Sequence, residues 1–172
     1  MKHKKKLISI IAITLAVIII LIIIGTVVVV SAGSIEYRFF TDINSFKKLD
    51  EYSTNKIDLS NDNELKELEV VFYYAEEISY EGKNYSIMAY VFADNTSAST
   101  YFKKCTGKES VNNWNFSLKS NLFFHSEYIA FYDNCLYRVI GGNYKSFVEV
   151  VNFISESFPI DYHDLYENEQ TE

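Results

Sequence analysis

The feature that most constrains this chain is a run of 24 uncharged residues from Leu7 to Val30. Apart from two threonines, one serine and one glycine, the run consists of isoleucine, leucine, valine and alanine. A helix of this length measures about 36 Å, and the hydrocarbon core of a bilayer is about 30 Å thick. Soluble cores rarely need so long an apolar helix. The run therefore predicts a transmembrane helix over residues 7–30.

The charges beside this run predict how the chain crosses the membrane. Residues 1–6 contain four lysines, and the positive-inside rule keeps such a basic N-terminus in the cytoplasm. The helix would then be an uncleaved signal anchor, with the rest of the chain outside the cell membrane. The small residues Val30, Ser31 and Ala32 leave a second interpretation open, in which cleavage after Ala32 releases a secreted protein. A signal peptide usually has an apolar region of only about 7–15 residues, which favours the anchor.

The part of the chain after the apolar run is acidic and rich in aromatic residues. Residues 35–172 carry 12 basic and 23 acidic side chains, a net charge of −11, and all 28 aromatic residues lie there. A field of this sign repels nucleic acid, so no nucleic-acid partner is expected. Disordered segments lack the aromatic material that a core needs. We therefore expect a folded extracytoplasmic domain.

Residues 31–63 are expected to form a juxtamembrane segment that precedes the folded core. Thr41 or Asp42 can cap a short helix in this segment. Three apolar residues recur there at helical spacing, namely Ile43, Phe46 and Leu49. Residues 54–63 are rich in Asn, Asp and Ser, which predicts a polar loop. The core would then begin at residue 64.

Residues 64–160 repeat the pattern strand, strand, helix, written ββαββα. The strand segments are rich in β-branched and aromatic residues, and turn residues separate them. Both helices carry apolar residues at helical spacing, and they end near Gly107 and Pro159. The expected strands lie over 68–80, 85–92, 114–119, 122–125, 127–132 and 135–140. These elements predict a two-layer α+β domain, an antiparallel sheet with both helices on one face, followed by a solvated acidic tail over 161–172.

Cys105 and Cys135 are the two cysteines of the chain, and both follow the predicted membrane span. Thiols can be oxidised outside the cytoplasm, and a bridge closing this loop of about 30 residues would contribute roughly 3–4 kcal/mol. A disulfide between them is the preferred interpretation. The alternative is that each packs in the core as a small apolar side chain.

A polar stretch ahead of the first long strand loosely resembles a calcium loop of the EF-hand type. Asp58, Ser60, Asp62 and Glu69 occupy its first, third, fifth and twelfth positions, where oxygen ligands can wrap a hard cation. Lys66 at the ninth position and the lack of glycine at the sixth oppose this interpretation. The four residues are weak metal candidates, and the main interpretation is a loop with a helix cap.

The sequence contains no catalytic motif that would identify an enzyme. His125 is the one histidine in the folded region, and the neighbours Glu76 and Glu77 would point to opposite faces of a strand. No cofactor is expected, and an enzyme acting through carboxylates is the least favoured class. The 14 tyrosines suit a protein interface, because tyrosine combines a large, stiff contact surface with a polar tip.

These features predict a single-pass membrane protein with a cytoplasmic N-terminus. Its extracytoplasmic domain is expected to bind another membrane or cell-surface protein. A cleaved, secreted binding protein is the alternative, and retention of residues 1–32 distinguishes the two.

Overall fold

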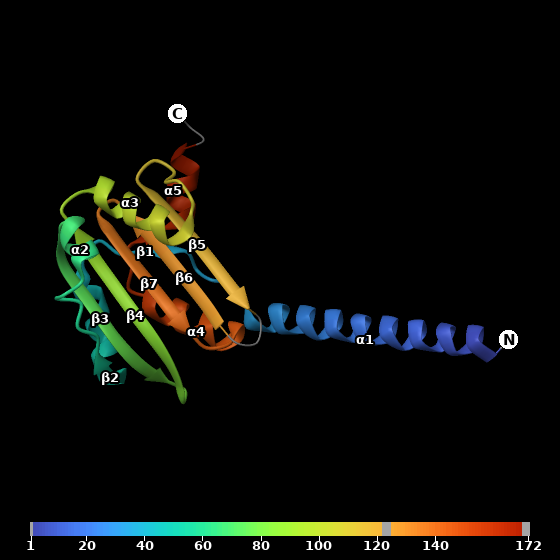
Figure 1. Ribbon diagram of the computed structural model, residues 1–172. Coiled ribbons are helices and arrows are strands. Elements are labelled where there is room, and N and C mark those ends of the chain that lie inside the picture. The colour runs from blue at the N-terminus through green and yellow to red at the C-terminus, as the bar shows by residue number, and fades with distance from the viewer. Residues whose placement is uncertain (1, 122–124, 170–172) are drawn as a thin grey trace.

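The computed structural model describes residues 2–121 and 125–169, and within its first helix the side chains of residues 10–24 and 26. Figure 1 shows a long helix that leads into a sheet with helices packed around it. The helices are α1 (Lys2–Ala32), the 3-10 helix η1 (Ile43–Tyr52), α2 (Asn63–Glu67), α3 (Asn95–Thr106), α4 (Tyr144–Ser155) and α5 (Tyr162–Glu169). The strands are β1 (Arg38–Phe39), β2 (Ser53–Lys56), β3 (Val70–Tyr80), β4 (Lys83–Phe92), β5 (Trp114–Asn121), β6 (His125–Tyr132), β7 (Cys135–Gly141) and β8 (Ile160–Asp161).

Within the described residues, six strands form an antiparallel sheet in the order β2-β3-β4-β7-β6-β5. The strands expected over 68–80 and 85–92, and those over 127–132 and 135–140, are confirmed as the antiparallel hairpins β3–β4 and β6–β7, and with them the α+β class. In the first hairpin, Glu81 and Gly82 have φ angles of 49° and 72°, the left-handed pair that suits a tight two-residue turn. β5 runs unbroken to Asn121, where two short strands were expected, and residues 122–124 lie outside the described part.

The helices α3 and α4 lie on opposite faces of the sheet, so the expectation that both cover one face is wrong. On β7, Leu136 belongs to the same core cluster as Phe102 of α3, whereas the next residue, Tyr137, belongs to a cluster with Phe147 of α4. Neighbouring residues of a strand point to opposite faces. The central strands are apolar at consecutive positions, and one layer of helices could cover only half of these side chains.

The segment before residue 64 is part of the core and not a separate lead-in. Phe40 and Phe46 are fully buried, with ring centroids 5.0 Å apart, and Phe46 also lies 5.3 Å from Phe158. The helix predicted after Asp42 is confirmed as η1, and the Asp42 carboxylate accepts a hydrogen bond from the Asn44 N–H (2.9 Å). The polar stretch after η1 begins with β2 instead of a loop, because a strand at the sheet edge can form through backbone hydrogen bonds alone.

The C-terminal residues pack against the domain over the described part. β8 pairs with β1, and α5 follows directly. The Tyr162 ring lies edge-on to Trp114 and Phe116, with centroid distances of 5.4 Å and 5.5 Å. The segment predicted as a solvated tail is therefore attached through Tyr162 and Leu165, while its charged side chains Asp164 and Glu167 are exposed. Residues 170–172 lie outside the described part.

The connection between α1 and the domain is short, and side-chain hydrogen bonds hold it. Gly33 has a φ of 78°, the left-handed conformation that commonly ends a helix. The Asn152 amide of α4 donates to the Ser34 carbonyl (3.0 Å) and accepts from the Glu36 N–H (2.8 Å). Along the part of the chain that the structure describes, no helix combines the length and the apolar character needed to cross a membrane.

We expect η1 to contribute strongly to the stability of the domain. Phe46→Ala should lower the free energy of unfolding by about 3–5 kcal/mol, because it removes a ring buried among Phe40, Tyr74 and Phe158. Phe72→Ala, the same change at an exposed position, should alter it by less than about 0.5 kcal/mol. Urea denaturation in detergent, followed by tryptophan fluorescence, measures both. Equal losses in the two variants would contradict the placement of η1 in the core.

Candidate functional site

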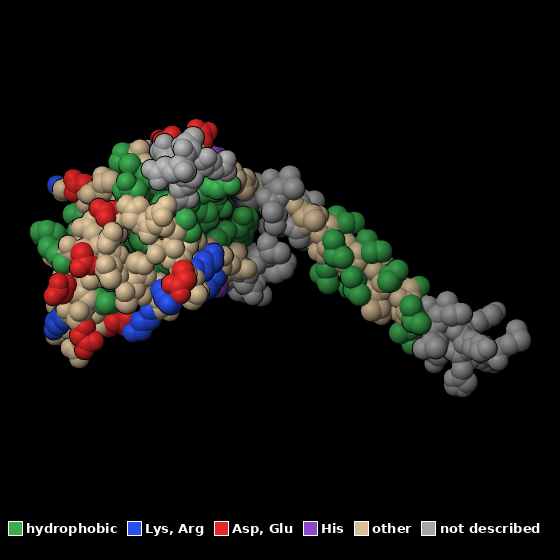
Figure 2. All heavy atoms as spheres, turned by 90° about the horizontal axis from the view of Figure 1, so that it is seen from above, with side chains coloured by type: hydrophobic (Ala, Val, Ile, Leu, Met, Phe, Trp, Pro, Cys, Tyr) green, Lys and Arg blue, Asp and Glu red, His purple; other side chains and the backbone are tan. Residues whose placement is uncertain are grey.

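The candidate site lies along β3, near one edge of the sheet and on the side away from α1 (Figure 1). β2 pairs with residues 76–78 of β3. In the part of the chain that the structure describes, no strand pairs with residues 70–75 on that side. Here Val71, Phe72 and Tyr73 are 54%, 62% and 42% exposed, and Figure 2 shows hydrophobic side chains at the surface at this end of the domain. The open half of β3, residues 70–74, is therefore an apolar strand edge.

The backbone of the open half directs hydrogen-bonding groups outward. The Ala75 carbonyl accepts from the Ile57 N–H (2.8 Å), and the Glu77 carbonyl accepts from the Thr54 hydroxyl (3.0 Å), so odd-numbered residues face the edge. Backbone groups alternate in direction along a strand. The N–H and C=O of Tyr73 therefore point to the edge beyond the end of β2, where an extended segment of another chain could pair with them.

The opposite edge of the sheet, β5, is protected at its first residues, Trp114 to Phe116. The Lys108 ammonium donates to the Phe116 carbonyl (3.3 Å), and Val111 and Trp114 exchange two backbone hydrogen bonds of 2.9 Å and 3.0 Å. Lysines and local irregularities are devices by which proteins block edge-to-edge association. The open half of β3 carries exposed apolar side chains instead, so the two edges differ in what they can accept.

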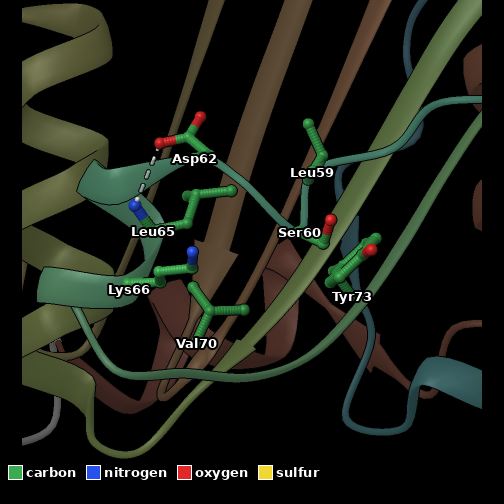
Figure 3. A pocket seen from close by; sticks show the side chains of 7 residues that line it. All are labelled: Leu59, Ser60, Asp62, Leu65, Lys66, Val70 and Tyr73. Atoms are coloured by element: carbon green, nitrogen blue, oxygen red, sulfur yellow. Dashed lines mark hydrogen bonds between the residues drawn. The ribbon is translucent and has the colours of Figure 1, made fainter.

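Two hollows flank Tyr73 along the open half of β3, and together they form what we call the β3 groove. The first has a volume of about 190 Å³ and is lined by Leu59, Ser60, Asp62, Leu65, Lys66, Val70 and Tyr73. Figure 3 shows these side chains, with Val70 and Tyr73 contributed by β3 and the others by α2 and the loop before it. The second has a volume of about 440 Å³ and is lined by Lys56, Ile57, Asp58, Tyr73, Tyr74, Ala75 and Glu76.

One wall of the groove is α2, which Asp62 caps. The Asp62 carboxylate accepts from the N–H groups of Glu64 (3.0 Å) and Leu65 (3.2 Å), and this bond is drawn in Figure 3 for Leu65. Leu65 buries its side chain in the cluster that contains Phe102 of α3. Lys104 of α3 forms an ion pair with Glu64 (2.5 Å). The wall is therefore attached to α3 and is not a free loop.

A buried glutamate and a tyrosine lie at the second hollow. Glu76 is 6% exposed, and among the described residues its Oε2 atom has no hydrogen-bond partner. Burial, reinforced by the Glu76 and Asp50 carboxylates and by a hydrogen-bonding interaction with Glu76, raises the pKa of Tyr74, so its hydroxyl stays protonated at neutral pH. A buried polar atom without a partner costs free energy, and it therefore requires an explanation.

The weak calcium candidates are not brought together as a metal site. The Asp58 carboxylate accepts hydrogen bonds from Ser60, which lower the pKa of Asp58, while Asp62 caps α2 and Glu69 is exposed with a φ of 53°. Among residues 2–121 and 125–169, no group of three or more His, Cys, Asp or Glu side chains could hold a metal ion. His125 is exposed at the start of β6.

Cys105 and Cys135, both described residues, are free, so the expected disulfide is wrong. Cys135 lies in the core cluster on the α4 face, whereas Cys105 packs against the cluster on the α3 face. The sheet separates the two thiols, and a disulfide requires Cα atoms within about 7 Å of each other. Each cysteine instead packs against apolar neighbours, as the alternative interpretation proposed.

The open half of β3 was not identified as a site from the sequence, although one signal was present. Residues 70–74 are apolar without interruption, within a run whose β-branched and aromatic content predicted a strand. A strand that is apolar on both faces needs a covering layer on each. The structure places the short helix α2, five residues long, beside this segment, and that is too little to cover it.

We expect the two thiols to differ in their reaction with iodoacetamide. Cys105 should react slowly in the native protein, and Cys135 only after unfolding, since burial raises the pKa of both and that of Cys135 to about 11. Thiolates are the reactive form, so labelling of Cys105 should still accelerate above the usual thiol pKa of about 8.5. Mass spectrometry after labelling gives the site. A gain of about two mass units on reduction would reveal a disulfide and contradict the assignment.

In comparisons with known proteins, no family model, no curated protein and no solved structure matches this chain.

Proposed function

We propose that this chain is a membrane-anchored binding module, and that its β3 groove takes an extended segment of another protein as an additional strand. The apolar, unpaired half of β3 is the observation that carries the proposal. An added strand forms backbone hydrogen bonds with the edge, and its alternate side chains enter pockets beside it. Val71, Phe72 and Tyr73 would leave water on binding, which contributes roughly 25 cal/mol per Å² of apolar area.

The partner in this proposal is a different protein, not a second copy of the chain. Residues 35–172 carry a net charge of −11, and Asp58, Asp62 and Glu69 lie at or beside the groove. Pairing two copies edge to edge would bring these like charges together, which opposes association. A neutral or basic segment meets no such repulsion.

The anchor in this proposal is α1. The uncharged run from Leu7 to Val30 is long enough to cross a bilayer, and it extends beyond the side chains that the structure describes. From Ile10 to Ile24, the described isoleucine, leucine and valine side chains are 45–63% exposed, and lipid is a better solvent for them than water. The lysines before the run favour a cytoplasmic N-terminus and an external domain. Cleavage after Ala32 would leave the same groove on a secreted protein.

The anchored form should resist extraction from membranes. After an alkaline carbonate wash, the intact chain should stay in the membrane pellet, because a spanning helix is held by apolar contacts that alkali does not break. Protease added to intact cells should remove the domain. The mature N-terminus, read by mass spectrometry, is the control. A chain that begins at Gly33 and stays soluble would establish the secreted alternative.

We expect partner binding to require the outward N–H of Tyr73. A photo-reactive benzoylphenylalanine in place of Phe72 should form an adduct in living cells, whereas the same group in place of the exposed Lys119 on β5 should not. Tyr73→Pro should abolish the adduct, because proline removes the edge N–H and leaves the β3–β4 hydrogen bonds in place. Tyr73→Val keeps the N–H and should keep the adduct.

Denaturant unfolding of Tyr73→Pro and Tyr73→Val verifies that both variants are folded. The identity of the adduct, and its loss in the proline variant alone, would support strand addition. An adduct that persists in Tyr73→Pro, or one that forms equally at both edges of the sheet, would rule it out.

A further inference from the structure

Glu76 lies where the open half of β3 meets β2. Lys56 of β2 is its register partner, and Lys56, Glu76 and Tyr74 share one face of the sheet. The Glu76 Oε2 atom is nevertheless inaccessible and without a hydrogen-bond partner among the described residues, and the buried Tyr74 hydroxyl lies close enough to the Glu76 carboxylate to interact with it. Lys56 is exposed and does not satisfy Oε2. Glu76 and Tyr74 both line the 440 Å³ hollow, although their polar atoms are buried beneath its surface.

The charges around this hollow favour a cation. Glu76 and Asp58 line it, and the Asp50 carboxylate of η1 acts on Tyr74. Lys56, on the rim, opposes these three negative charges with one positive charge. An entering cation is attracted by this arrangement, and an entering anion is repelled.

We propose that this hollow is the specificity pocket of the β3 groove and receives an arginine or lysine side chain of the docked segment. The proposal rests on the strand addition proposed above. A residue of the added strand opposite Tyr74 lies on the same face as Glu76 and one diagonal step from it, about 7–8 Å, which a long side chain can span. Its N–H donors then bond to the Glu76 carboxylate beside Tyr74, and docking turns the Oε2 atom, which is buried and without a partner, toward the hollow.

A peptide series tests this pocket on the full chain in lipid nanodiscs. The host is a fluorescent peptide of alternating valine and threonine with glycine-serine ends. In each member of the series, one threonine is replaced. The replacement is arginine in the first set, its neutral isostere citrulline in the second, and glutamate in the third. Fluorescence anisotropy gives the Kd. Arginine at one position should bind at least about tenfold more tightly than citrulline there.

Three variants connect this preference to the pocket. Glu76→Gln should make arginine and citrulline bind alike, and its melting temperature should not fall, because the variant removes a buried carboxylate with an unpartnered oxygen. Tyr74→Phe keeps the ring and should reduce the preference in part. Lys56→Gln is the matched charge control, and it should keep or increase the preference, since it removes the competing cation.

Equal binding of arginine and citrulline at every position, with the host peptide still bound, would overturn the pocket and leave strand addition intact. A preference for glutamate that disappears in Lys56→Gln would also overturn it, since the rim lysine would then be the recognition group. Binding by no member of any set would contradict strand addition itself.

Discussion

Strands β4 and β7 pair in the middle of the sheet and bury side chains on both faces, Tyr137 and Val139 toward α4 and Leu136 toward α3. Each fully buried apolar side chain contributes about 1.5–3 kcal/mol, so the central pair requires a covering layer on each side. α3 and α4 provide these layers, and η1 and the short β1–β8 sheet complete the α4 side. The covering elements lie over the centre of the sheet, whereas the short helix α2 lies beside the outer part of β3.

Two departures from stable packing coincide in the same stretch of β3. Its first half exposes three consecutive apolar residues, and its middle buries a glutamate that has an oxygen without a partner. Either feature alone could be tolerated as a local cost. Both features lie beside the β3 groove, whereas Lys108 blocks part of the other edge of the sheet. Departures from stable packing that cluster in this way are expected at functional sites.

Elements with strong local signals could be predicted from the sequence. α3 begins after Asp94 and ends at Gly107, and α4 begins after Asn143, because caps and apolar spacing are properties of neighbouring residues. The two-sided cover of the sheet could not be predicted, because consecutive apolar residues on β4 do not reveal which helix lies on which face. β2 has no apolar pattern at all, and it exists only because β3 pairs with it. The candidate site depends on strand order, which is a long-range property, and so it was missed together with Glu76.

Asn152 forms hydrogen bonds with the chain directly after Gly33, so the linker between an anchored helix and the domain would be restrained and not flexible. In the proposed anchored form, such a junction would restrict the height and tilt of the groove above the lipid surface, on the flank turned away from α1 (Figure 1). A partner embedded in the same membrane then searches for it in two dimensions, at a high effective concentration, and a weak contact per strand suffices for occupancy. A partner arriving from solution gains nothing from this geometry. In the proposed anchored form, this restrained junction would therefore favour partners within the plane of the membrane.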